Sequence, residues 1–196
     1  MNRTRRNFDL ASWSKLAHMG STNAILGLSQ MVNEEMQVTA LDLQEVSLRN
    51  ATSLMGKAED VVVGIYLLFS GNGDGQIMLA FPPETAFELV DMLMAQTSGS
   101  TTELGDMERS ALGEIGNIVG SFFLNAVADY AGLRLLPSPP AVVMDMAGAI
   151  IGSLMAPVFS STESVFVIKM NFSTQSRQIE GRFLVLPTFD STADTS

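Results

Sequence analysis

Residues 106–130, DMERSALGEIGNIVGSFFLNAVADY, decide the fold of this chain. The stretch contains no proline, and its apolar residues recur three and four positions apart: Ala111, Ile115, Ile118, Phe122 and Ala126, with Leu112, Val119 and Phe123 beside them. Such spacing predicts an amphipathic helix with a wide buried stripe. Asp106 is the expected N-cap, and its carboxylate, like that of Glu108, suits the positive end of the helix dipole.

The opposite face of this predicted helix is polar. At about 100° per residue, four side chains fall within a band roughly 60° wide: Ser110, Glu114, Asn117 and Ser121. Three glycines form a flanking stripe: Gly113, Gly116 and Gly120. Each glycine inside a helix costs about 1 kcal/mol relative to alanine, so the stripe indicates a close approach of another element. Most acid–amide pairs on outer helix faces are simply solvated, so a functional interpretation of this pair depends on a longer pattern.

That longer pattern is Ser110-x3-Glu114-x2-Asn117-x22-Pro140. It resembles the signature of the CheC-type chemotaxis phosphatases, a family that also includes CheX and the flagellar switch protein FliY. The sequence EIGNI at 114–118 is similar to the active helix of that family, and the resemblance extends from about residue 10 to residue 187. It implies a phosphatase that accelerates hydrolysis of the aspartyl phosphate of a CheY-like response regulator.

By this resemblance, Glu114 and Asn117 are the catalytic residues. Asn117 would orient the attacking water, because an amide oxygen accepts a hydrogen bond while the NH₂ group donates one. Glu114 would pair with a lysine of the receiver domain, and Ser110, Ser121 and Pro140 would be docking contacts. The receiver already holds Mg²⁺, and positioning and electrostatics carry most of phosphoryl transfer, so no cofactor or metal of the chain's own is expected.

Composition limits the other classes of function. The chain has 196 residues, 46% of them hydrophobic and 16% charged, which indicates a globular protein long enough for one sizeable core. It has no cysteine and a single histidine, His18, so thiolate and multi-histidine metal sites are excluded, and a reducing cytoplasm is the expected location. A net charge of −10 argues against nucleic acid as a partner. The acidic surface can steer basic partners or simply maintain solubility.

A membrane span is not expected. The basic start of the chain is not followed by an apolar segment typical of a signal peptide. Residues 141–159 come closest to the length of a span, but Asp145, Gly148, Gly152 and Pro157 interrupt them. This segment predicts a buried strand followed by a short helix.

The remaining elements are predicted from periodicity and turn residues. In chain order they are a mobile basic tail (1–9), a long helix (10–35), a strand (37–48), a short helix (50–59), a hairpin (61–70 and 76–81), a helix (84–96), a linker (97–105), the central helix, a strand (141–146), a short helix, two strands (164–173 and 179–186) and a mobile tail (189–196). The GNGDG sequence between the hairpin strands is interpreted as a plain turn. Phe81 stands where a calcium loop needs its glutamate, and no lysine is present for a phosphate cradle.

The second half of the chain repeats the first at an offset of about 100 residues. VVVGIYLLFS at 61–70 parallels SVFVIKMNFS at 164–173. A single domain at 10–188, made of the repeats 10–96 and 106–188, is therefore expected to have pseudo-twofold symmetry. The expected class is α+β, with two long helices on one face of a shared, largely antiparallel sheet, as the family resemblance also implies.

The first repeat carries a degenerate copy of the site. An ungapped alignment of the halves places Ala11, Lys15 and His18 opposite Ser110, Glu114 and Asn117. No proline occurs near residues 39–41, and Lys15 reverses the charge needed to meet a lysine of the receiver. The first site is therefore expected to be inactive.

Two other classes of function remain open. The first is a non-enzymatic chemotaxis adaptor that binds the deamidase CheD or phosphorylated CheY, or a component of the flagellar switch. The second is a small-molecule hydrolase, which would need a second carboxylate or a histidine near Glu114, and the repeat offers none. A monomer is expected, because both halves lie in one chain.

Overall fold

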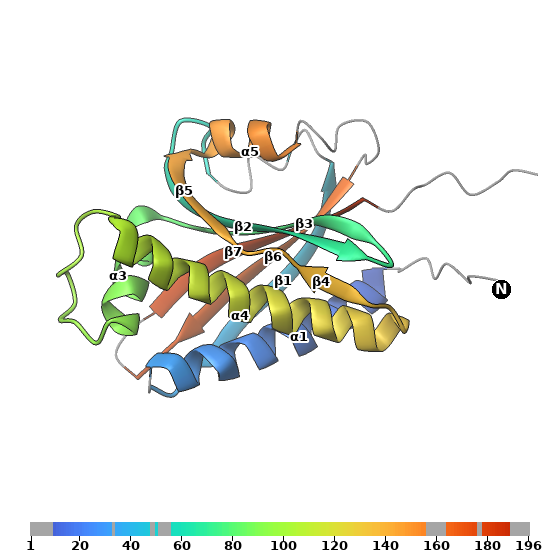
Figure 1. Ribbon diagram of the computed structural model, residues 1–196, viewed down its shortest axis with the longest axis horizontal. Coiled ribbons are helices and arrows are strands. Elements are labelled where there is room, and N and C mark those ends of the chain that lie inside the picture. Colours follow the sequence, from blue (N-terminus) through green and yellow to red (C-terminus); the bar gives the residue numbers. More distant parts are fainter. Residues whose placement is uncertain are drawn as a thin grey trace, which may run out of the picture.

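Two long helices, α1 (Leu10–Val32) and α4 (Asp106–Ala131), lie side by side on one face of a seven-stranded sheet (Figure 1). The structure is a computed structural model that describes residues 10–32, 34–47, 50, 56–155, 164–175 and 178–188. Both predicted tails, 1–9 and 189–196, and residues 51–55 of the predicted helix at 50–59 lie outside the described residues. The described end of that predicted helix, 56–59, is not helical but forms a turn, in which the N–H of Asp60 donates to the carbonyl oxygen of Lys57 at 3.1 Å. The two long helices thus occupy the places that the sequence predicted for them.

The other elements also follow the predicted order. The strands are β1 (Gln37–Ser47), β2 (Val61–Gly71), β3 (Asp74–Phe81), β4 (Leu135–Pro137), β5 (Ala141–Met146), β6 (Ser164–Ser173) and β7 (Gln178–Thr188). The shorter helices are α3 (Pro83–Leu93) and α5 (Ala147–Met155). The three-residue strand β4 is the one described element that the sequence did not predict.

The strand order is symmetric about the centre of the sheet. It runs β1-β6-β7-β3-β2-β4, with β5 also paired to β2, and every pairing is antiparallel. The hairpin β2–β3 of the first half therefore pairs with β5 of the second half, and the hairpin β6–β7 pairs with β1 of the first. This arrangement confirms the α+β class and the pseudo-twofold duplication.

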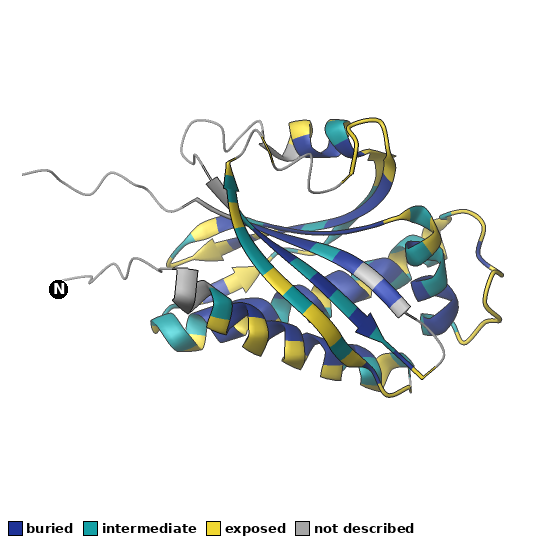
Figure 2. Ribbon diagram, turned by 180° about the vertical axis from the view of Figure 1, so that it is seen from behind, coloured by how far each residue is buried: buried dark blue, intermediate teal, exposed yellow. Residues whose placement is uncertain are grey.

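Alternation along the central strands gives the sheet two apolar faces. On β2, the side chains of Val63, Ile65, Leu67 and Phe69 are buried in the main core with α1, α3 and α4. The intervening Val62 joins a second, smaller core on the other face, formed with α5 and the strands β3, β6 and β7. Viewed from behind (Figure 2), the central strands are buried, whereas the edge strand β1 is exposed or half-buried along its whole length.

Glycines of α1 allow the two long helices to approach closely. A Cβ atom at Gly20 would lie 3.0 Å from Cδ2 of Phe123, and one at Gly27 would lie 2.6 Å from Cε2 of Phe122. Phe123 continues inward and meets the ring of Phe183 edge to face, with centroids 4.9 Å apart. Phe122, which the sequence placed in the buried stripe, is instead 36% exposed, because it lies at the outer rim of the seam between the helices.

The start of α4 differs from the prediction by one residue. Gly105 is the N-cap, in an extended conformation and without a side-chain cap, and Asp106 is the first helical residue. Asp106 and Glu108 nevertheless lie in the first turn, where the helix dipole favours acidic groups. The helix ends before Gly132, whose φ of 67° is left-handed and suits a C-cap glycine.

The predicted apolar segment at 141–159 does not form a span in the part that the structure describes. Its residues up to Met155 form β5 and α5, as expected. By length and composition alone, α4 could cross a membrane, but half of its most apolar window is buried within the protein. Core helices of globular proteins have the same length and composition, and the buried residues of α4 belong to the main core.

Candidate functional site

The outer face of α4 presents an acid and an amide side by side. The side chains of Glu114 and Asn117 are both exposed, and Nδ2 of Asn117 donates a hydrogen bond to Oε2 of Glu114 at 3.1 Å. Ser110 is exposed one turn before Glu114, and Ser121 is half-buried one turn after Asn117. The helix thus keeps all four predicted polar side chains on one face, as residues three and four apart on a helix must be.

The distant proline of the sequence pattern lies beside this face. Pro140 stands between β4 and β5 and is half-buried against α4. A Cβ at Gly116 would lie 3.1 Å from Cβ of Pro140, and a Cβ at Gly113 would lie 3.8 Å from its Cγ. Arg109 links α4 to β5, because its Nη1 donates a hydrogen bond to the carbonyl oxygen of Val142 at 3.0 Å. The structure therefore brings Pro140 next to the helix that carries Glu114 and Asn117.

The close approach predicted from the glycine stripe is made by the sheet. Gly116 and Gly120 are buried, and Cβ atoms at these positions would lie 2.6 Å from Cγ2 of Ile65 and 2.5 Å from Cδ2 of Leu67. Both positions therefore face β2 rather than the outer surface. Gly113 differs, because it is half-buried at the rim, between Pro140 and the polar face.

A buried carboxylate holds the segment that leads into α4. It was not predicted from the sequence. Asp91, on α3, is fully buried and accepts four hydrogen bonds. Oδ2 accepts from the backbone N–H groups of Gly99 (2.7 Å) and Ser100 (3.1 Å), and Oδ1 accepts from the N–H (2.9 Å) and hydroxyl (2.7 Å) of Thr101. Burial raises the pKa of Asp91, but the hydrogen bonds from Thr101, Gly99 and Ser100 outweigh it, so the net pKa lies below the usual aspartate value. Residues 97–105, predicted as a linker, are thus tied to α3 just before the helix that carries the site.

The corresponding face of α1 carries different chemistry. Lys15 and His18 are exposed, and the side chain of Ala11 lies outside the described residues. Nζ of Lys15 stands 5.7 Å from the centroid of the Tyr130 ring on α4, within the range of a cation–π contact. Lys15 therefore links the two helices, at the position where the second half has Glu114.

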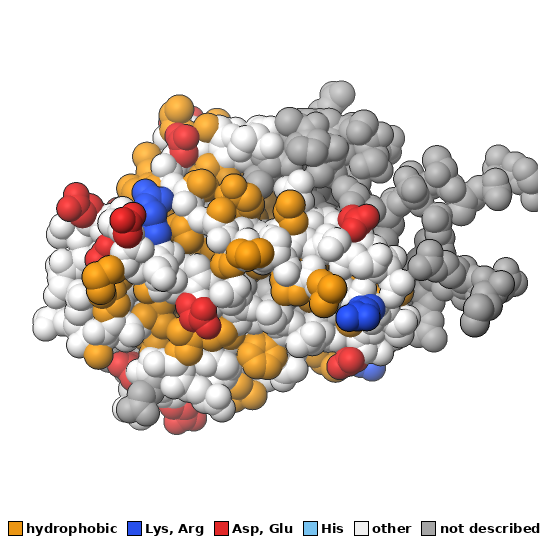
Figure 3. Space-filling model, in the orientation of Figure 1, with side chains coloured by type: hydrophobic (Ala, Val, Ile, Leu, Met, Phe, Trp, Pro, Cys, Tyr) orange, Lys and Arg blue, Asp and Glu red, His pale blue; other side chains and the backbone are white. Residues whose placement is uncertain are grey.

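Large apolar side chains are exposed on α4 and on β5, a strand that contacts α4. Met107 on α4 is 68% exposed, and Met144 and Met146 on β5 are 41% and 48% exposed. The space-filling view of this side (Figure 3) shows several apolar patches and few charged groups. A surface of this kind suits contact with another protein, because it offers apolar area around a few polar groups.

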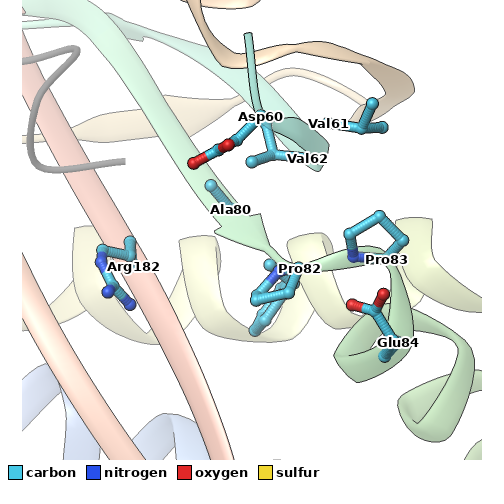
Figure 4. A pocket seen from close by; sticks show the side chains of 9 residues that line it. Asp60, Val61, Val62, Ala80, Pro82, Pro83, Glu84 and Arg182 are labelled. Atoms are coloured by element: carbon cyan, nitrogen blue, oxygen red, sulfur yellow. The ribbon is translucent and has the colours of Figure 1, made fainter. Parts of the chain in front are cut away.

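A cavity of about 410 Å³ lies elsewhere, at the start of α3 (Figure 4). Asp60, Glu84 and Arg182 contribute its charged side chains, and no predicted site residue lines it. Among the described residues, no group of three or more histidine, aspartate or glutamate side chains could hold a metal ion.

Comparisons with known proteins return the family that the sequence pattern resembles. The model of the CheC-like family matches residues 107–144, which span α4, Pro140 and most of β5. The CheY-P phosphatase CheC of Bacillus subtilis (strain 168) is 26% identical over 181 residues, covering 90% of this chain and 87% of that protein. The putative CheY-P phosphatase CheC1 of Halobacterium salinarum (strain ATCC 29341 / DSM 671 / R1) is 25% identical over 134 residues, covering 68% of each chain.

Solved structures show the same fold. FliY of Thermotoga maritima superposes with a TM-score of 0.73 at 17% identity, over 87% of this chain and 85% of that one. The complex of CheX with CheY, BeF3 and Mg²⁺ from Borrelia burgdorferi gives a TM-score of 0.55 at 15% identity, over 88% of this chain and 98% of the matched chain. The chain is therefore similar in sequence to the CheC proteins, most clearly over residues 107–144, and similar in fold to FliY and CheX.

Proposed function

We propose that this chain accelerates hydrolysis of the aspartyl phosphate on a CheY-like receiver domain in the cytoplasm. The observation that carries the proposal is the exposed pair of Glu114 and Asn117 on α4, joined by a 3.1 Å hydrogen bond and flanked by Pro140. Two relatives are named as CheY-P phosphatases, one of them putatively, and a structural neighbour was solved in complex with CheY, BeF3 and Mg²⁺. These names support a receiver as the partner.

The proposed reaction needs little from this chain beyond position. Water attacks phosphorus, the bond between phosphorus and the aspartyl oxygen breaks, and the receiver keeps its carboxylate while inorganic phosphate leaves. Mg²⁺ belongs to the phosphorylated receiver and stabilises the charge on the phosphoryl oxygens. The catalyst must then place a water in line with the breaking bond, which is where proximity contributes most.

Asn117 is the residue suited to hold that water. Its side chain is short and fixed to a helix, so the position of the amide is well defined relative to α4. Oδ1 can accept a proton of the water while Nδ2 donates to another oxygen. In the free protein Nδ2 is occupied by Glu114, so the amide is already oriented before a partner arrives.

Glu114 is suited to fix the partner. A carboxylate one turn from Asn117 can form a charge-assisted hydrogen bond with a lysine of the receiver, and such bonds are roughly twice as strong as neutral ones. A carboxylate can accept more than one hydrogen bond, so Glu114 can meet the lysine while it still accepts from Nδ2 and keeps the amide of Asn117 oriented.

The test is phosphate release from a Mg²⁺-loaded phosphorylated CheY-like receiver. Asn117→Ala is expected to reduce the stimulated rate by about 10²-fold, because loss of one positioning contact in an active site costs about this much. Glu114→Ala is expected to raise the receiver concentration needed for half-maximal rate. Both side chains are exposed, so the melting temperature should be nearly unchanged.

The matched control is Asn125→Ala. Asn125 is also an exposed amide on α4, but it lies two turns beyond Asn117, about 12 Å along the axis. It should retain the full stimulated rate. Retained stimulation in both Asn117→Ala and Glu114→Ala would reject the assignment of the site.

A binding-only role is the second candidate. It is favoured by Lys15 and His18 on α1, which leave the chain with a single complete pattern. An adaptor would bind the phosphorylated receiver, or the deamidase CheD, without changing the rate of phosphate release. Measuring binding and phosphate release on the same receiver separates the two candidates.

A further inference from the structure

One glycine of α4 is not explained by packing against the described residues. Gly116 and Gly120 are required by their contact with β2, where a Cβ would clash. Among the described residues, a Cβ at Gly113 would meet only Cγ of Pro140, at 3.8 Å, which is an ordinary van der Waals distance. The backbone at 113 is also ordinary, because the glycines with positive φ are others: Gly56, Gly71, Gly99 and Gly132. Alanine would fit here and would form a better helix.

The position of Gly113 relates it to the polar pair. It lies one turn before Asn117 and one turn after Ser110, directly next to Glu114 in sequence, and it is half-buried beside Pro140. The hydrogen atom of Gly113 therefore stands where a side chain would otherwise rise between Pro140 and Asn117. We call this low point, bounded by Gly113, Pro140 and Asn117, the 113 notch.

The short reach of Asn117 gives the notch its importance. To hold a water by hydrogen bonds, an amide must lie within about 3 Å of it, and that water must in turn reach phosphorus. An asparagine amide stands only two carbon atoms from the helix backbone. The rim of a partner's phosphorylated pocket must therefore come close to α4. A methyl group on the helix beside Asn117 would move that rim away from the helix by roughly one carbon–carbon bond, about 1.5 Å.

We propose that Gly113 is a docking position, kept without a side chain so that the rim of the phosphorylated receiver pocket can come close to α4 at the 113 notch. This inference rests on the proposed function, and it assigns Gly113 a contact with the partner rather than a role in the fold. A displacement of about 1 Å in an active site can lower a rate by about 10²-fold. Gly113→Ala is therefore expected to lower the activity while leaving the fold of the protein intact.

The experiment compares Gly113→Ala and Gly113→Val with wild type and with Gly152→Ala. Gly152 is an exposed helical glycine on α5, on the opposite face of the sheet, with no atom of the described residues within 4 Å of an added Cβ. Three quantities are measured: the melting temperature, kcat/KM for phosphate release from the Mg²⁺-loaded phosphorylated receiver, and Kd for the same receiver activated with Mg²⁺ and beryllofluoride.

Gly113→Ala is expected to melt at or above the wild-type temperature and to lose 10-fold or more in kcat/KM, with a weaker Kd. Gly113→Val should lose more on both activity and binding, because its side chain is larger. Gly152→Ala should keep wild-type activity and binding. If Gly113 served packing alone, Gly113→Ala would lower the melting temperature. It would not lower kcat/KM while the protein stayed stable.

Three results overturn the inference. If Gly113→Ala lowers the melting temperature, the glycine has an internal role. If the variant is stable and has wild-type kcat/KM and Kd while Asn117→Ala is inactive, the notch is wrong but the proposed function stands. If wild-type protein neither binds the receiver nor accelerates phosphate release, or if Asn117→Ala is fully active, the proposed function fails and the notch fails with it.

Discussion

Gly116 lies on the buried side of α4, beneath the polar face, and between Glu114 and Asn117 in sequence. Replacing it with alanine places a Cβ 2.6 Å from Cγ2 of Ile65 and 3.1 Å from Cβ of Pro140. Optimal carbon–carbon contacts lie at about 3.5–4.0 Å, so the new atom stands roughly 1 Å too close to Ile65. Ile65 cannot retreat easily, because it is fully buried and its strand is hydrogen-bonded on both sides, to β3 and to β5.

The expected magnitude follows from two opposing terms. Overpacking a core costs about 1–3 kcal/mol, and the upper half of that range applies here because a β-branched side chain has few rotamers to escape into. Alanine recovers about 1 kcal/mol of helix propensity. The net loss is therefore about 1–2 kcal/mol. For a chain of this length, about 2–4 °C is lost per kcal/mol, so the melting temperature should fall by about 2–8 °C.

Thermal unfolding followed by circular dichroism measures this change, and Gly113→Ala on the same helix is the matched control. The two substitutions have equal chemistry and equal helix propensity, and they differ in the atoms that the new Cβ meets. Gly113→Ala should melt at or above the wild-type temperature while Gly116→Ala melts below it. If Gly116→Ala is as stable as wild type, then the close contact between α4 and β2 does not require a glycine at position 116.

Two further predictions concern residues outside the site. Asp91→Asn should lose about 2–4 kcal/mol at pH 7, because its amide cannot accept from both Gly99 and Ser100. Because folding lowers the pKa of Asp91, its contribution is complete above about pH 4 and is lost as the pH falls through the folded value. Urea unfolding should therefore show a smaller gap between wild type and variant at pH 3 than at pH 7, and an equal gap would contradict this account. Lys15→Met should lose at most about 1 kcal/mol, since it removes one exposed contact with Tyr130, and should keep wild-type phosphate release; a loss of release would mean that α1 carries a working site.

Local patterns in the sequence predicted most of the elements. The run at 141–146 and the run at 164–173 became β5 and β6 with the same bounds, and 106–130 became α4 with one residue more. The duplication also followed from the sequence, because both halves carry the same series of apolar runs. Periodicity and turn residues act over a few positions, and this is the range over which they determine the structure.

Features that depend on distant contacts could not be predicted in the same way. The sequence predicted that another element packs closely against the glycines of α4. It did not predict that the side chains in contact are those of Ile65 and Leu67 on β2. Asp91 stood within an apolar helix with no sign that its partners follow 8 to 10 residues later in a segment rich in serine and threonine. In each case the partner is chosen by the tertiary fold, and local periodicity carries no information about it.

The exchange of first strands between the two halves has a consequence for how the chain is made. Strand β1 ends at Ser47, yet its hydrogen-bonding partner β6 begins only at Ser164. While the chain emerges from the ribosome, the ladder of β1 cannot close until β6 has been synthesised, and pairing across so long a separation is slow. We therefore expect the sheet to stay incomplete until β6 has emerged, and nascent chains that stop before β6 to require protection by chaperones.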